Sequence, residues 1–135
     1  MVDTVTTQTL LDGERLVIQK FTNLSDGTGE AAVNKMVPSA YAANSFGAAC
    51  TGLKLNRIWS TTNGMAVRLL WDADADVLAW VIPQETNYYM HFGEHLGGIP
   101  NNAGTGSTGA LAFTTVGATS GDSYSIIIEA IKVYG

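Results

Sequence analysis

The 135-residue sequence is poor in charge, cysteine and proline. Charged residues make up 14% of the chain, whereas an ordinary soluble domain has roughly a quarter. The exposed surface must therefore be built largely from Thr, Ser, Asn and Gly. A surface with so little charge protects weakly against association. This shortage favours a chain that works inside an assembly.

Basic residues are the scarcer of the two charge types. The chain has seven Lys and Arg against twelve Asp and Glu, which gives a net charge of −5, and the basic residues form no run. Proteins that bind nucleic acid need a positive surface to neutralise phosphates, and anionic membranes attract the same feature. We therefore expect no nucleic-acid partner and no membrane partner.

Cysteine occurs once, at Cys50, so no disulfide can form within the chain. We interpret Cys50 as a buried small apolar residue; a reactive thiol is the alternative. The N-terminus lacks the cationic region and apolar run of a signal peptide, and no apolar run is long enough to span a bilayer. These features predict a protein made in a cytoplasm that stays soluble.

The segment from Leu53 to Ile82 contains all three tryptophans and organises the predicted fold. Apolar residues recur there with a period of two, which is typical of strands with one buried face. Asn63-Gly64 favours a tight hairpin turn between the first two runs, so we expect a meander. Together with two C-terminal strands, this pattern predicts a core of Leu55, Trp59, Val67, Leu69, Trp71, Leu78, Trp80, Phe113, Ile126 and Ile128.

The rest of the chain also alternates or turns rather than following a helical period. We expect further strands at 4–11, 15–22, 30–37, 88–92, 110–116 and 124–129, a loop with one helical turn at 39–51, and a long loop at 93–108. Eight or nine short strands with regular turn signals predict an all-β fold, an antiparallel β-sandwich or a barrel. We assign residues 1–135 to a single domain.

Acidic and imidazole side chains offer two possible metal sites. Asp72, Asp74 and Asp76 alternate as at the start of a calcium-binding loop, but Val77 and Pro83 stand where that loop needs Gly and a bidentate Glu. A solvated turn is the favoured interpretation.

His91 and His95 have the spacing of two zinc ligands on a helix. Gly93, Gly97 and Gly98 argue against a helix there, so we interpret both as hydrogen-bonded loop histidines. We expect no metal and no other cofactor.

Catalytic motifs are not evident. The Gly104–Gly109 segment resembles a phosphate loop but lacks the Lys-Ser/Thr pair, and no G-x-S-x-G motif occurs. We therefore predict a protein that is not an enzyme, with a metal-dependent hydrolase as the remotest alternative.

Aromatic residues raise the alternative of carbohydrate binding. Trp59, Trp71 and Trp80 are in phase with apolar neighbours, which places them in the predicted core. Only Tyr88 and Tyr89 remain as a plausible exposed pair.

Four segments resemble a family of small virion proteins of tailed bacteriophages, including cyanobacterial phages. They are VTTQTLLDGERLVIQKFTNLSDGTGE, LKLNRIW, GMAVRLLWDA and TTVGATSGDSYSIIIE. The resemblance covers most of the chain, but not residues 39–49 or 91–102. The resemblance implies a β-sandwich structural protein, and within that family it is most similar to a capsid decoration (cement) protein with a jelly-roll-like fold. A tail or fibre-associated component is the alternative.

The same resemblance implies a location on the capsid surface of the virion, contact with the major capsid protein and a homo-oligomer, with a trimer favoured. The terminal segments and the 93–108 loop are the segments least able to order themselves, so we expect them to make contacts. The predicted contact residues are Met1, Val2, Asp3, Tyr88, Tyr89, Asn101 and Asn102.

Overall fold

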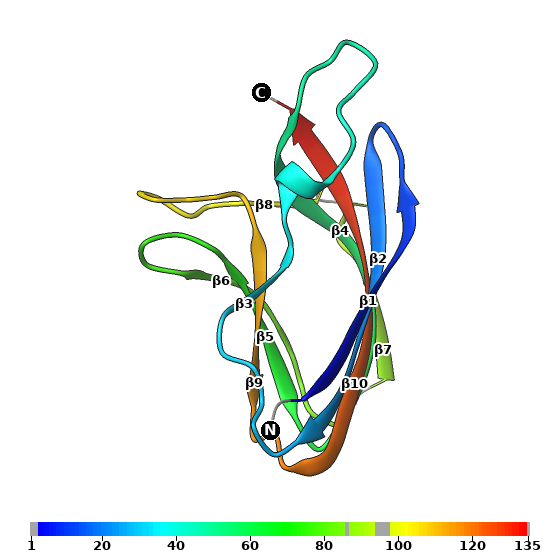
Figure 1. Cartoon of the computed structure of the whole chain (residues 1–135), viewed down its shortest axis with the longest axis vertical. Helices are drawn as coiled ribbons and strands as arrows, with labels where there is room; N and C mark the ends of the chain where they lie inside the picture. Colours follow the sequence, from blue (N-terminus) through cyan, green and yellow to red (C-terminus); the bar gives the residue numbers. More distant parts are fainter. Residues whose placement is uncertain (1–2, 86, 94–97, 135) are drawn as a thin grey trace.

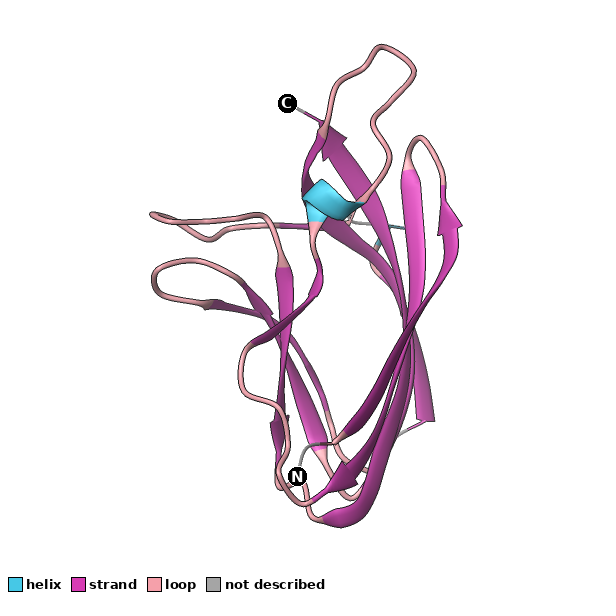
Figure 2. Ribbon diagram, in the orientation of Figure 1, coloured by secondary structure: helices cyan, strands magenta, loops and turns pink. Residues whose placement is uncertain are grey.

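Two antiparallel β-sheets face each other in the computed structural model, which describes residues 3–85, 87–93 and 98–134 (Figure 1). Strands account for nearly all of the regular structure in these residues, and the helix that Figure 2 shows is the short 3-10 turn η1, Pro38–Ala40. The expected all-β sandwich is therefore confirmed, with ten strands rather than eight or nine.

The larger sheet has the order β1-β2-β10-β4-β7, and a short strand, β8, also pairs with β4. Its strands are β1 (Thr4–Asp12), β2 (Leu16–Asp26), β10 (Ser120–Tyr134), β4 (Cys50–Asn63), β7 (Asn87–His91) and β8 (Ile99–Pro100). The smaller sheet has the order β3-β9-β5-β6. Its strands are β3 (Val33–Met36), β9 (Leu111–Val116), β5 (Ala66–Trp71) and β6 (Val77–Ile82).

The predicted hairpin across Asn63-Gly64 is wrong. Strand β4 pairs with β10, β7 and β8, whereas β5 pairs with β6 and β9 in the other sheet. Gly64 does adopt a positive φ of 83°, but its turn carries the chain from one layer to the other. Both strands can then bury an apolar face against the same core. A hairpin within one sheet would also bury both faces, so the sequence pattern does not distinguish the two arrangements.

The space between the sheets is filled by one cluster of buried apolar side chains. Seven of the ten predicted core residues are fully buried there: Leu55, Val67, Leu69, Trp71, Phe113, Ile126 and Ile128. Phe113 makes edge-to-face contacts with Phe21 and Tyr124, at centroid distances of 5.2 and 5.9 Å. Cys50 is buried as expected.

The prediction that Trp59 belongs to the core is wrong, because Trp59 lies on the outer face of β4. The β10–β4 ladder shifts register at Asn56, so this strand carries one extra residue between Leu55 and Arg57. Such a β-bulge moves all later side chains to the opposite face. Leu53 and Leu55 point inward before the bulge and Ile58 points inward after it, leaving Trp59 outside.

The prediction that Leu78 belongs to the core is also wrong, and Trp80 is only partly buried. The β5–β6 ladder shifts at Ala79, and Leu78 is 50% exposed as a result. Trp80 packs against the core from the edge strand β6, with its ring 4.7 Å from that of Phe92.

Candidate functional site: the outer face of the larger sheet

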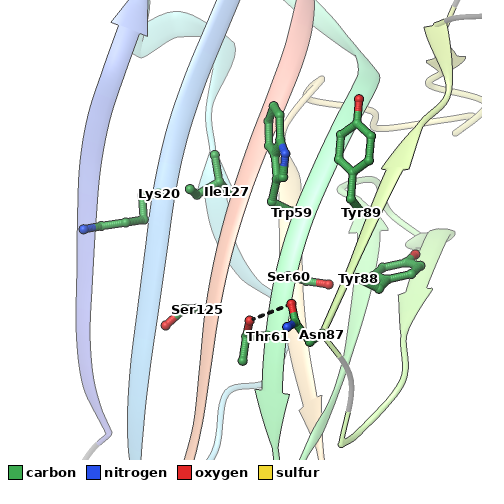
Figure 3. Close-up of a pocket in the computed structure, with 9 residues that line it drawn as sticks. All are labelled: Lys20, Trp59, Ser60, Thr61, Asn87, Tyr88, Tyr89, Ser125 and Ile127. Carbon is green, nitrogen blue, oxygen red and sulfur yellow. Dashed lines mark hydrogen bonds between the residues drawn. The ribbon is translucent and has the colours of Figure 1, made fainter.

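A row of five side chains crosses the outer face of the larger sheet, one from each main strand. In register they are Gln8 on β1, Lys20 on β2, Ile127 on β10, Trp59 on β4 and Tyr89 on β7. The Trp59 and Tyr89 rings lie side by side with centroids 5.3 Å apart (Figure 3). We call this the aromatic row.

The next row along the strands is built from hydroxyl and amide side chains. It contains Thr6, Thr22, Ser125, Thr61 and Asn87, again one from each strand. Thr6 and Thr22 are hydrogen-bonded, and the Thr61 and Asn87 side-chain oxygens lie 3.5 Å apart (Figure 3). We call this the hydroxyl row; each hydroxyl can both donate and accept a hydrogen bond.

A shallow hollow of about 360 Å³ lies where the two rows meet. Its lining includes Trp59, Thr61, Tyr89 and Ser125, and Tyr89 is 47% exposed. The residues that line it offer apolar contact and hydrogen bonds rather than a nucleophile with a base.

On the other side of the aromatic row lies a third row, in which the charges are paired. Its members are Leu11, Ile18, Glu129, Arg57 and His91. Arg57 Nε lies 3.0 Å from Glu129 Oε2, and the same oxygen accepts a hydrogen bond from Asn56 Nδ2 at 2.5 Å. Glu129 is buried, so its charge is neutralised within this chain.

Tyr88 and Tyr89 do not form the exposed pair that the sequence suggested. Tyr88 points to the inner side of β7, packs against the core and accepts a hydrogen bond from the Trp80 indole. On this face of the sheet the aromatic pair is therefore Tyr89 with Trp59, the residue that the bulge at Asn56 turns outward.

The Asp72–Asp76 turn uses its carboxylates for hydrogen bonds. Asp72 Oδ2 accepts from Thr108 Oγ1 at 2.7 Å, and Asp76 Oδ1 accepts from the Ala73 backbone N–H at 3.1 Å. In the described part of the chain no three potential metal ligands of the His, Cys, Asp or Glu type come together. His91 lies on the outer face opposite Arg57, whereas His95 falls outside the described residues.

The prediction of Asp3 as a contact residue is wrong, because its side chain is buried. Its carboxylate accepts hydrogen bonds from Asn23 Nδ2 at 3.0 Å, Ser25 Oγ at 3.3 Å and the backbone N–H groups of Asp26 and Gly29. Burial alone would raise the pKa of Asp3, but these hydrogen bonds together hold the pKa below its ordinary value. Asp3 thus anchors the start of β1.

The other predicted contact residues stay predictions. Met1 and Val2 fall outside the described residues. Asn101 borders a second hollow of about 360 Å³ beside Pro100 and Val133, and Asn102 is exposed.

Phe46 is a candidate contact residue that the sequence interpretation missed. It is 93% exposed in the loop between η1 and β4. Asn44 Oδ1 accepts hydrogen bonds from the backbone N–H groups of Phe46 and Ala48 at 3.0 and 2.9 Å, and Glu14 Oε1 accepts two from Ser45. The turn residues Asn44 and Gly47 flank Phe46 in sequence, and they are the signal that could have identified it.

No protein-family model matches the chain, and no curated protein matches its sequence. None of the described helices is both long and apolar enough to cross a membrane.

Proposed function

We propose that this chain is a non-enzymatic virion structural protein of a tailed phage that decorates the outer capsid and stabilises the head. The observation that carries the proposal is strand β1. All nine of its residues are exposed, and among the described strands it pairs with β2 alone.

Apart from a register shift between Thr9 and Leu11, strand β1 lacks the features that keep the edges of sheets from pairing. It contains no proline and no lysine, its one charged residue is Asp12 at its end, and Val5, Leu10 and Leu11 are 44 to 48% exposed. Proteins usually protect such an edge with charge, proline or a covering segment, because its free backbone groups can add a strand from another chain. In this proposal the major capsid protein covers the edge.

The strand order supports a jelly-roll as the form of the sandwich. Strands β2-β10-β4-β7 face β3-β9-β5-β6, and the chain passes between the sheets at β2–β3, β3–β4, β4–β5, β6–β7, β8–β9 and β9–β10. Repeated crossing between two four-stranded layers is the pattern of two Greek keys, which occurs in viral capsid domains.

Decoration needs many weak contacts made together. An oligomer with cyclic symmetry, a trimer in the favoured arrangement, would present the same patch to each neighbouring shell subunit. Its avidity could then exceed the affinity of one contact by orders of magnitude. Phe46 suits such a contact, since a preorganised loop loses little freedom when its aromatic side chain is buried by a partner.

The direct test is binding to expanded shells of the phage that encodes the chain. We expect the purified chain to sediment with the shells and to raise the temperature at which they break. Val5→Lys should weaken binding by about tenfold or more, since a charge on an edge strand blocks strand addition. Val33→Lys is the matched control, because Val33 is 40% exposed on β3, the edge strand of the smaller sheet.

Shells that neither bind the chain nor gain heat resistance would contradict the proposal. Equal loss of binding in Val5→Lys and Val33→Lys would show that β1 is not the contact. Phe46→Ser separates the loop from the edge, because it leaves β1 unchanged.

A carbohydrate-binding or tail-associated module for host attachment is the second candidate function. The observation that favours it is the Trp59–Tyr89 pair beside the hydroxyl row, since aromatic faces and hydroxyl groups together suit a polar ligand with apolar faces. Glycan-array binding that Tyr89→Ala abolishes would support this function. Tyr88→Ala does not test it cleanly, because Tyr88 packs against the core.

A further inference from the structure

We infer that a second copy of this chain packs on the outer face of the larger sheet, where Trp59, Ile127 and Tyr89 make the apolar contacts. The inference rests on the proposed function in supposing an assembly, and it names the face and the partner within it. The shell contact uses Phe46 and the free backbone edge of β1, whereas this face uses the outward side chains of the sheet, among them Thr6 and Gln8 of β1.

The size of the face fits a stable protein contact. The β2–β10 and β10–β4 ladders run for ten and twelve residue pairs. Strands β1, β2, β10 and β4 run for nine residues or more and β7 for five. At about 4.8 Å between strands and about 3.4 Å per residue, they make a face of about 570 Å². A stable complex buries about 800 Å² on each partner, so this face supplies most of one side.

The smaller sheet offers no comparable surface. Its four strands are four to six residues long, so its outer face is about half the length. Its exposed apolar residues do not share a row that spans the sheet: Leu78 and Val81 lie on β6, Val33 on β3 and Val116 on β9, each at a different register position.

Charge favours this face for contact between identical chains. The chain carries a net charge of −5, so two copies repel unless they meet where carboxylates are few. Glu129 is the carboxylate in the three rows, and it is buried and paired with Arg57. Lys20 in the aromatic row adds no negative charge, so the repulsive surface of each copy stays away from the contact.

The hydroxyl row makes the face compatible with a copy of itself. Thr6, Thr22, Ser125 and Thr61 carry hydroxyl groups that both donate and accept, and the Asn87 amide does the same. Such groups find partners in an identical row, whereas a row of like charges would not. Contact between identical faces has two-fold symmetry, so it pairs two copies in place of the trimer favoured above. The Trp59 and Tyr89 rings supply the large apolar contact that dominates the energy of interfaces.

The experiment measures the mass of the chain in solution by sedimentation equilibrium over a range of concentrations. We expect a self-associated wild type and a dissociation constant raised about tenfold or more in Tyr89→Lys, which buries a charge within the contact. Val81→Lys should leave the mass unchanged. The two sites are matched: Tyr89 is 47% and Val81 42% exposed, and both lie on edge strands.

Thr61→Lys is the second variant on the face, for use if Tyr89→Lys does not fold. Thr61 is exposed, so its substitution leaves the core intact. The circular dichroism and melting temperature of each variant show whether it is folded before its mass is interpreted.

Two outcomes overturn the inference. The first is a wild type that is monomeric at every concentration. The second is an oligomer whose mass is unchanged by both Tyr89→Lys and Thr61→Lys. A monomer that binds glycan through Trp59 and Tyr89 would assign the face to carbohydrate instead. Shell binding is measured separately, so a monomer that still decorates shells leaves the proposed function intact, and an oligomer that ignores shells leaves the inference intact.

Discussion

Strands β5 and β4 each carry a leucine and a tryptophan at even spacing, but the two tryptophans lie on different sides of their sheets. In β5, Val67, Leu69 and Trp71 alternate and all three are fully buried. In β4, Leu55 and Trp59 also stand at even spacing, yet Leu55 is buried and Trp59 lies on the outer face. The two tryptophans therefore have different roles: Trp71 fills the core and Trp59 forms the candidate interaction face.

One residue accounts for the difference. Asn56 is the extra residue of the bulge, and its side chain donates to Glu129 while its carbonyl oxygen accepts from the Phe92 backbone N–H at 2.7 Å. These contacts hold the bulge at this place in the strand. A local hydrogen-bonding arrangement thus decides which side of the sheet carries an indole, and alternation alone cannot reveal it.

The largest expected effect separates the two tryptophans. Trp71→Ala should lower the free energy of unfolding by about 3 to 5 kcal/mol, because it leaves a cavity in the core. Trp59→Ala should cost less than about 1 kcal/mol in the monomer, since the site is at the surface. Urea unfolding at low protein concentration, followed by circular dichroism, measures both. Equal losses would mean that Trp59 is also a core residue.

The next prediction tests the bulge itself. Asn56→Ala removes the hydrogen bond to the Glu129 carboxylate, and hydrogen bonds to charged groups contribute about 1.5 to 3 kcal/mol. We expect the free energy of unfolding to fall by an amount in that range. Asn87→Ala is the control, because Asn87 is exposed and the oxygen contact with Thr61 is 3.5 Å long. A loss no larger than that of Asn87→Ala would show that the Asn56 side chain does not hold the bulge.

Much of the fold follows from the sequence, and the exceptions have physical causes. Alternation within β5, β9 and β10 correctly predicts Val67, Leu69, Phe113 and Ile126 as core, because no register shift lies between their predicted positions. The Asn63-Gly64 turn was recognised, but pairing within a sheet and crossing between sheets use the same turn residues. Sequence spacing therefore predicts elements better than it predicts which elements pair.

The candidate site was harder to predict than the core. Tyr89 was identified as exposed, whereas Trp59 was assigned to the interior and Phe46 was not recognised. The rows on the outer face depend on the pairing of β1, β2, β10, β4 and β7, whose residues are far apart in the chain. No local pattern contains that information.

Acidification tests whether the ionised Asp3 carboxylate stabilises the fold. The sequence analysis predicted Asp3 to be a surface contact residue, whereas the structure buries its side chain. The pKa of Asp3 is lowered in the folded chain, so its ionised form stabilises the fold above the ordinary aspartate pKa of about 3.9. That stability is lost as the pH falls through the folded-state pKa. Asp3→Asn should cost about 1 to 2 kcal/mol near neutral pH, from its weakened hydrogen bonds.

The difference between Asp3→Asn and the wild type should therefore shrink as the pH is lowered from about 6 towards 3. Urea unfolding at several pH values measures this difference, with Asp74→Asn as a control on an exposed turn. A difference that stays constant with pH would show that the Asp3 carboxylate is not ionised in these hydrogen bonds.

The smallest expected effect concerns Leu78, the residue that alternation placed in the core. Because the register shift at Ala79 leaves Leu78 half-exposed on an edge strand, Leu78→Thr should change the free energy of unfolding by no more than about 0.5 kcal/mol. Leu69→Ala, on the paired strand β5, should cost about 2 to 5 kcal/mol. If the two losses were similar, β6 would pair without its bulge and Leu78 would point inward. A tenfold ratio would instead show that a single extra residue can reverse the environment of a leucine, as Asn56 does for Trp59.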